Sequence, residues 1–208
     1  MPRARKTKPR RRLDAETARA LILDATEKRL VVVGPAGIRL QEVAADAGVS
    51  HPTVLHHFGS REQLVAAVIA RSLQAINTAL VEAIRASSGD EKQLEEMIEN
   101  VAVAMERSGH GRVILWLTLE GHRIDGAKVR LIDVVEATHA LRLARSTAIE
   151  RPTREDTART VVLAALALIS SSVLGPSLLE NAGLGAGARV GKEFTRWIAR
   201  LLLDHFDR

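Results

Sequence analysis

The sequence predicts an all-α protein made of an N-terminal three-helix domain at residues 13–60 and a larger helical domain at residues 61–208. Three observations support this prediction. Apolar residues recur at helical spacing through most of the chain, no stretch of useful length alternates as a strand does, and no repeat of solenoid period is present. The chain has 208 residues, which is enough to bury a substantial core.

A basic segment precedes the first predicted helix. Residues 1–12 include seven Lys or Arg side chains and two prolines, so we expect a disordered arm. Residues 1–60 hold 11 Lys or Arg and 6 Asp or Glu, whereas residues 61–208 hold 19 of each. The whole formal surplus of +5 therefore lies at the N-terminal end, which favours interaction with a polyanion.

Glycine, proline and short polar side chains delimit the N-terminal helices. The first long helix is predicted from Asp14 to Val33, and Gly34 and Pro35 stop it. Its apolar face comprises Ala18, Leu21, Ile22 and Ala25. A second, short helix follows, with one apolar stripe made of Leu40, Val43, Ala44 and Ala47.

A tight turn and a third helix complete the predicted domain. Gly48 follows the second helix at once, where a helix end favours a residue that tolerates positive φ. Ser50 is placed to cap the third helix, and Pro52 lies in its first turn, where a missing N–H costs little. We expect its buried side to consist of Val54, Leu55 and Phe58. Two helices joined in this way are a helix-turn-helix, whose second helix enters the major groove of DNA.

After Ser60 the pattern is helical almost to the end of the chain. Ser60 and Gln63 form a capping box, and an apolar stripe from Leu64 to Ile84 predicts a long helix. Further helices are predicted at residues 90–107, 113–119 and 127–149. Another begins at Thr153 and ends at Gly175-Pro176, and a final helix begins near Val190.

The penultimate predicted helix has an unusual composition. Residues 160–179 carry no charge, which is long enough to be mistaken for a membrane span. Its serines and its Gly-Pro break favour a buried core helix and no association with a membrane. The helix is apolar nearly all round and therefore needs cover on every side. A second copy of the chain is one source of that cover, and a central position in a monomer is the other.

Residues 14–70 resemble the TetR family of bacterial transcriptional regulators. The resemblance rests on the long first helix with its glycine-rich turn, the stretch VAADAGVS, Thr53 with the run His56-His57-Phe58, and Ser60-Arg61-Glu62. Two positions differ, because Leu55 stands where the family usually has tyrosine, and Arg39 where Thr or Ser usually caps a helix. The resemblance implies a TetR-like fold of about nine helices, in which the second domain binds a ligand and dimerises.

The predicted DNA-binding residues lie on the arm and at the starts of helices. Thr53 is placed to touch a thymine methyl group or to hydrogen-bond a base edge. Arg39 and Arg61 are expected to contact phosphate and so to set the register on DNA. His57 is expected to pack or to meet phosphate, as its place in the family pattern implies. The full predicted set is Arg10, Arg11, Arg12, Arg39, Ser50, His51, Pro52, Thr53, His56, His57 and Arg61.

The resemblance also implies how the second domain works. The last two helices would pair with their copies in a four-helix bundle, and the homodimer would place two recognition helices about 34–36 Å apart on an inverted repeat. The predicted dimerisation residues are Val161, Leu166, Ile169, Val173, Phe194, Trp197, Ile198 and Leu201. A small-molecule effector of unspecified chemistry would release the repressor from its operator. The candidate ligand-binding residues are Asn100, Met105, Trp116, His122 and His139.

Other function classes have weaker support in the sequence. There is no cysteine, and His51, His56 and His57 do not share a helix face, so we expect no metal and no cofactor. The glycines at 183, 185, 187 and 191 follow no strand, and no nucleophile elbow is present, so we expect no enzyme. The alternative function is a non-specific architectural DNA-binding protein, which has little need of so large a neutral domain. The lack of cysteine and of an apolar opening segment predicts a cytoplasmic, nucleoid-associated protein.

Overall fold

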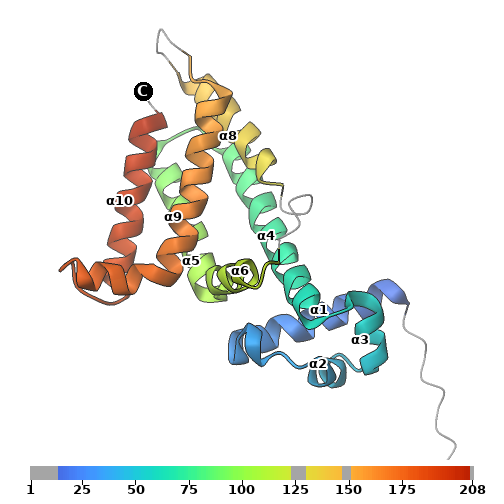
Figure 1. The fold of residues 1–208 in the computed structure, drawn as a ribbon. Helices are drawn as coiled ribbons and strands as arrows, with labels where there is room; N and C mark the ends of the chain where they lie inside the picture. The colour runs from blue at the N-terminus through green and yellow to red at the C-terminus, as the bar shows by residue number, and fades with distance from the viewer. Residues whose placement is uncertain (1–13, 123–129, 147–150, 207–208) are drawn as a thin grey trace, which may run out of the picture. The chain divides into compact units, whose positions relative to one another are not determined.

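The computed structural model describes residues 14–122, 130–146 and 151–206. Within these residues there are nine α-helices, one short 3-10 helix and no strand (Figure 1). The all-α prediction is therefore confirmed. The chain forms two compact units, and the boundary between Val65 and Ala66 lies inside a helix rather than after residue 60. The predicted arm, with Arg10, Arg11 and Arg12, lies outside the described residues.

The N-terminal unit contains α1 (Ala15–Val33), η1 (Pro35–Gly37), α2 (Leu40–Asp46), α3 (His51–Phe58) and the start of α4 (Arg61–Ala86). Asp14 caps α1, since its carboxylate accepts a 2.7 Å hydrogen bond from the Thr17 N–H. Gly34 ends α1 with φ of +68°, and its N–H donates to the Leu30 carbonyl. The predicted bounds of this helix are confirmed to within one residue.

A small apolar core holds these helices together. Its fully buried members are Ile22 of α1, Val43 of α2, Val54 of α3, and Leu64 and Val65 at the start of α4. Leu21 and Leu55 were expected on buried faces, but both are exposed, Leu55 to 39%. Leu55 follows Val54 directly, and 100° around an eight-residue helix takes its side chain past the edge of the buried face.

The C-terminal unit continues α4 and adds α5 (Glu91–Ser108), α6 (His110–Leu119), α8 (Leu131–Arg145), α9 (Arg154–Asn181) and α10 (Ala188–Phe206). In Figure 1, α9 lies between α8 and α10, and it also packs against α5 and α6. Ion pairs join α10 to α5: Arg196 Nε lies 2.7 Å from Glu99 Oε1 and Arg200 Nε 3.2 Å from Glu95 Oε1.

The end of α9 corrects one prediction. The helix does not end at Gly175-Pro176 but continues to Asn181, with Pro176 inside it. Proline removes one amide donor, that for the Ser172 carbonyl, and the helix continues for five further residues despite this loss. The helix ends where Gly183 adopts φ of +78° and the Leu184 N–H donates to the Leu179 carbonyl. A turn that closes with hydrogen bonds, rather than the proline, therefore sets the end of the helix.

Candidate functional site

The turn between α2 and α3 has the geometry that the sequence predicts. Gly48 has φ of +67°, and the Val49 N–H donates to the Ala44 carbonyl at 3.0 Å. Ser50 caps α3, because its Oγ accepts a 3.2 Å hydrogen bond from the Thr53 N–H. The two hydroxyl oxygens of Ser50 and Thr53 lie 2.8 Å apart. These contacts fix the start of α3 and the direction of its first turn.

One side of α3 is anchored and the other is exposed. Val54 and Phe58 are buried, and the Arg19 guanidinium of α1 lies 4.5 Å from the centre of the Phe58 ring. On the outer side, Pro52 and His56 are exposed, whereas the predicted DNA-binding residues His51, Thr53 and His57 are half-buried. The structure therefore brings the predicted residues of α3 onto one short helix whose first turn is accessible.

The two arginines that were predicted to contact phosphate differ in their surroundings. Arg39 is exposed at the start of α2, where its side chain makes no capping hydrogen bond. Arg61 donates from Nε to Glu62 at 2.8 Å and from Nη1 to the Ala36 carbonyl at 3.3 Å. Arg61 thus also ties the start of α4 to the segment after α1. Arg39 has the freer side chain for a phosphate contact.

A cationic side chain also braces α2 from α1. The Arg29 guanidinium bonds both Asp46, at 2.6 Å, and Glu42. Its hydrogen bond to Asp46 holds the pKa of that carboxyl below its usual value. This brace places the first helix of the helix-turn-helix against α1, and no sequence pattern predicted it.

The C-terminal unit contains a partly open cavity of about 650 Å³. Helices α4, α5, α6, α8, α9 and α10 all contribute to its wall, which is mostly Leu, Ile, Val and Met. This volume is within the range of about 300–1,000 Å³ that is typical of small-molecule sites. Of the predicted ligand-binding residues, Met105 lines the cavity, whereas Asn100, Trp116, His122 and His139 lie outside its wall.

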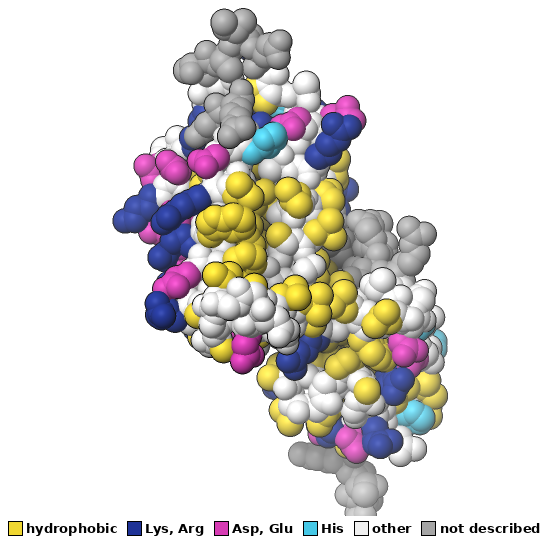
Figure 2. Space-filling view, turned by 60° about the vertical axis from the view of Figure 1, so that its left-hand side comes forward, with side chains coloured by type: hydrophobic (Ala, Val, Ile, Leu, Met, Phe, Trp, Pro, Cys, Tyr) yellow, Lys and Arg dark blue, Asp and Glu magenta, His cyan; other side chains and the backbone are white. Residues whose placement is uncertain are grey.

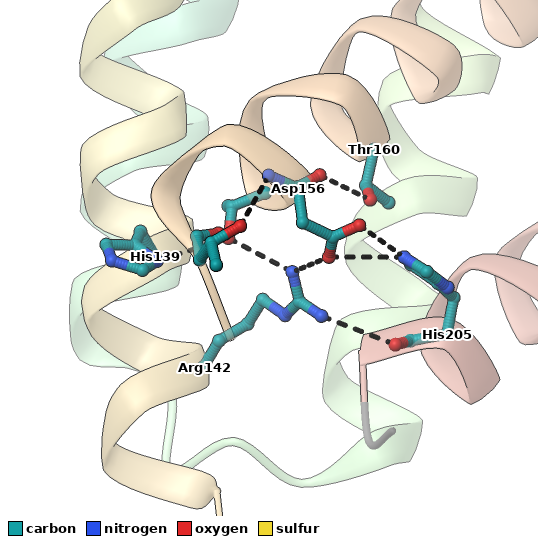
Figure 3. Close-up of polar contacts among 7 residues, drawn as sticks. His139, Arg142, Asp156, Thr160 and His205 are labelled. Atoms are coloured by element: carbon teal, nitrogen blue, oxygen red, sulfur yellow. Dashed lines mark hydrogen bonds and ion pairs between the residues drawn. The ribbon is translucent and has the colours of Figure 1, made fainter. Parts of the chain in front are cut away.

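A buried arginine at one end of the cavity is the main polar feature that sequence reasoning missed. The Arg142 side chain is 5% exposed, and its Nη1 donates to Asp156 at 2.7 Å and to Thr157 at 3.0 Å (Figure 3). Its Nη2 donates to the His205 carbonyl at 3.3 Å. A signal was available, because Arg142 follows the buried Val135 by seven residues and therefore lies on the same face of α8.

Asp156 balances this arginine from the start of α9. Its carboxylate accepts hydrogen bonds from Arg142 and from His205 Nε2, the latter at 3.0 Å (Figure 3). The bond from Arg142 lowers the pKa of Asp156, and that from His205 acts in the same direction. The cluster therefore joins α8, α9 and the end of α10 at one end of the cavity. His139 also contributes, since its Nδ1 lies 3.2 Å from Thr157 Oγ1.

A large hydrophobic face on α9 and α10 is uncovered. Leu166, Trp197 and Leu201 are 58%, 57% and 52% exposed, and Figure 2 shows hydrophobic side chains gathered on this side of the unit. The other exposed apolar residues of these helices are Val162, Leu163, Leu174 and Leu178. The single chain therefore does not cover α9 on every side, and the alternative of a central helix buried within a monomer is wrong. By length and composition α4 and α9 could each cross a membrane, and only 11% of the most apolar 18-residue stretch of α9 is buried.

The structure sorts the predicted dimerisation residues into two groups. Leu166, Trp197 and Leu201 lie on the uncovered face, whereas Val161 and Ile198 are buried within the unit. The remaining three residues, Ile169, Val173 and Phe194, are half-buried. Val161 and Ile169 line the cavity and so cannot be assigned to the surface alone. Periodicity locates an apolar helix, but it does not tell which of its sides a neighbouring helix already covers.

Comparisons with known proteins agree with this architecture. Residues 22–68 match the family model described as bacterial regulatory proteins, tetR family. An HTH-type transcriptional repressor of Mycobacterium tuberculosis is 31% identical over 127 residues, which are 61% of this chain and 60% of the relative. The chain therefore aligns with less than two thirds of that protein. The regulator BetI of Rhizobium meliloti is 27% identical over 119 residues, which are 57% of this chain and 58% of BetI.

Solved structures extend the likeness over nearly the whole chain. A TetR-family transcriptional regulator from Pectobacterium atrosepticum has a TM-score of 0.71 and is 17% identical, with 95% of this chain and 97% of that one covered. The regulator FadR from Bacillus subtilis, solved in complex with stearoyl-CoA, has a TM-score of 0.59 at 13% identity, with 88% of this chain and 96% of FadR covered. At these identities the likeness concerns the fold. Residues 22–68, which include the helix-turn-helix, thus match the tetR family model, and the chain has the fold of solved TetR-family regulators.

Proposed function

We propose that the protein is a transcriptional repressor that binds a specific inverted-repeat operator as a homodimer and is released by a small molecule. The observation that carries this proposal is the anchored α3, with its accessible first turn, within the segment that matches the tetR family model. The mycobacterial relative named as a transcriptional repressor supports the choice of repression. Neither catalysis nor a cofactor is part of the proposal.

In the proposed complex, α3 lies in the major groove and its first turn reads base edges. His51, Pro52, Thr53 and His56 supply the candidate contacts there, with Ser50 holding the turn. Arg39, Arg61, His57 and the arm with Arg10, Arg11 and Arg12 contact phosphates on either side. The phosphate contacts position the protein, and the contacts of α3 specify the sequence.

Selection of bound fragments from random DNA tests specificity directly. A short inverted repeat is expected, whereas a non-specific architectural protein, which is the alternative function, would yield no consensus. Fragments should be selected at moderate salt, because the basic arm strengthens binding to any sequence at low salt. Selection without a consensus would overturn the proposed function in favour of the alternative.

We assign the uncovered face of α9 and α10 to the homodimer. A hydrophobic face of this kind costs free energy in water, and a second copy would cover it with an identical face. Leu166→Glu places a charge on this face, where Leu166 is 58% exposed, so the variant should fold and yet remain monomeric. Leu119→Glu is the matched control, since Leu119 is 86% exposed on α6, and this variant should dimerise normally.

Sedimentation velocity gives the result for both variants. The expected outcome is a dimer for the wild type and Leu119→Glu, and a monomer with weaker operator binding for Leu166→Glu. A wild-type monomer at micromolar concentration would contradict the assignment of this face.

We also propose a cytoplasmic location, in which the protein is associated with the nucleoid through its binding to DNA.

The cavity supplies the candidate effector site. FadR, which shares the fold, was solved with stearoyl-CoA, so a chain of this architecture accommodates a ligand with a long apolar part. Binding would release DNA if the ligand favoured a conformation in which the two α3 helices of the dimer no longer match the operator spacing. Displacement of a labelled operator fragment by candidate ligands tests this part of the proposal.

A further inference from the structure

The cavity of the C-terminal unit has a chemically uneven wall. Its charged residues, Arg142 and Arg145, come from the end of α8 together with Ser146, and the other hydroxyl or amide side chains of the wall are Asn77, Thr138 and Thr160. No Asp or Glu contributes to the wall among the residues that the structure describes. The wall itself has two cationic side chains and no carboxylate, and Asp156, which pairs with Arg142, lies outside the wall. This arrangement favours an anionic ligand group over a cationic one.

Arg142 lies beside the start of α9, where that helix begins to line the wall. Arg142 contacts Asp156 and Thr157 at the start of α9, and Arg145 donates from Nη1 to the Gly89 carbonyl before α5. The wall then follows α9 from Thr160 to Ile169, a helix length of about 13 Å. Met105 and Ile114 line the wall beside Ile169, where α6 packs against α9, and this part of the wall is apolar.

Arg142 keeps one hydrogen-bond donor without an acceptor. Its Nη1 and Nη2 are bonded, but its buried Nε has no partner among the described residues (Figure 3). Buried donors in native proteins are nearly always bonded, and an exception needs an explanation. Arg142 lines the cavity, so a small rotation of its guanidinium on ligand binding would bring this donor to a ligand oxygen.

We propose that the cavity binds an elongated apolar molecule that ends in a carboxylate, with the carboxylate at Arg142 and Arg145 and the apolar chain directed towards Met105 and Ile114. This inference rests on the proposed role of the cavity as effector site and adds the chemical class of the effector. Asp156 holds the Nη side of the Arg142 guanidinium and so presents it in a fixed orientation. An unbranched saturated carboxylate is the simplest molecule with these features.

Calorimetric titration of the full-length protein with three matched probes tests the inference. The probes are dodecanoate, dodecan-1-ol and dodecyltrimethylammonium, each below its aggregation concentration. One dodecanoate should bind per chain, at least about tenfold more tightly than the alcohol. The reason is that its carboxylate would form a charged hydrogen bond with the Arg142 donor that otherwise lacks a partner. Equal binding of the alcohol, tighter binding of the ammonium probe, or no binding of any probe would overturn the inference.

Variants locate the head group. Arg145→Met should weaken the binding of dodecanoate by about tenfold and leave the binding of the alcohol unchanged. Arg159→Gln is the control and should change neither affinity, because the Arg159 side chain is 75% exposed and lies outside this wall. Arg142→Gln should lose the preference for the carboxylate, and if it does not fold, Arg145→Met and the wild-type probes still decide. Unchanged carboxylate preference in Arg145→Met would refute the placement of the head group.

Operator release separates this inference from the proposed function. Dodecanoate that binds with the expected preference but leaves operator DNA bound would support the chemical class and contradict the effector role. An alcohol that binds as well as the carboxylate and releases DNA would overturn the chemical class and support the effector role.

Discussion

Gly111 of α6 is expected to be intolerant of a single added methyl group. A Cβ at this position would overlap Ser172 Oγ and would lie 3.1 Å from both the Ile169 carbonyl oxygen and Val173 Cγ2. Ser172 Oγ is itself held by a 2.7 Å hydrogen bond to the Ile169 carbonyl, and the carbonyl cannot move without α9. The α6–α9 contact therefore depends on a residue without a side chain.

Two opposing effects determine how Gly111→Ala changes the free energy of unfolding. Alanine gains about 1 kcal/mol over glycine from helix propensity. Inserting a methyl group into a packed contact costs about 1–3 kcal/mol, and here the upper half of that range applies because one of the close atoms is backbone. We expect a net destabilisation of about 1–2 kcal/mol, which lowers the melting temperature by about 2–8 °C for a chain of this size.

Gly191→Ala is the matched control, because a Cβ at Gly191 in α10 would meet nothing within 4 Å. That variant should gain up to about 1 kcal/mol. Ser172→Ala removes the overlapping hydroxyl, so the double variant Gly111→Ala/Ser172→Ala should recover part of the loss relative to Ser172→Ala alone.

Urea unfolding followed by circular dichroism measures all four variants, at one protein concentration because dimerisation would shift the apparent stability. If Gly111→Ala proves as stable as Gly191→Ala, or if the double variant shows no recovery, the steric account of the α6–α9 contact is incorrect.

Three further predictions concern the N-terminal unit, the arm and the Asp156 cluster. Thr53→Ala should lower affinity for the selected operator by about 1 kcal/mol or more and hardly affect random DNA, whereas an equal reduction on both would make Thr53 a structural residue. Deleting residues 1–12 should reduce the slope of log K against log salt by about 0.9 for each phosphate that the arm neutralises, and an unchanged slope would exclude the arm from DNA binding. The pKa of Asp156 is lowered from 3.8 by the hydrogen bond from Arg142, so its ionised form stabilises the fold above that pH and the stability is lost as pH falls towards the native pKa. Acid unfolding of Asp156→Asn should accordingly be less steep than that of the wild type, and parallel curves would count against this linkage.

Local patterns predicted the N-terminal unit well because short-range chemistry defines its helices. Asp14 and Ser50 cap helices with their own side chains, and Gly34 and Gly48 adopt positive φ where the helices end. These preferences act over about four residues and need no knowledge of the rest of the chain. Pro176 shows the limit of such signals, because α9 continues through it to the turn at Gly183.

The candidate site was only partly predictable. The residues of α3 followed from the motif, but of the five residues chosen for the ligand site only Met105 lines the cavity. The sequence of the middle helices did not indicate which of their polar and aromatic side chains face the cavity. Arg142 was overlooked because a charged residue in a helical segment is usually exposed, and its burial depends on Asp156, fourteen positions away in the next helix.

The amino-acid sequence by itself determined the helical class, the helix-turn-helix with its caps, the basic N-terminal end and the apolar composition of α9. Each of these follows from spacing and residue type within one segment. Only the tertiary structure decided which sides of α9 meet other helices, and hence that the cavity lies on one side and the uncovered hydrophobic face on another. The physical reason is that burial is a property of packed neighbours: an apolar helix can satisfy several arrangements, and the contacts of α5, α6, α8 and α10 select among them.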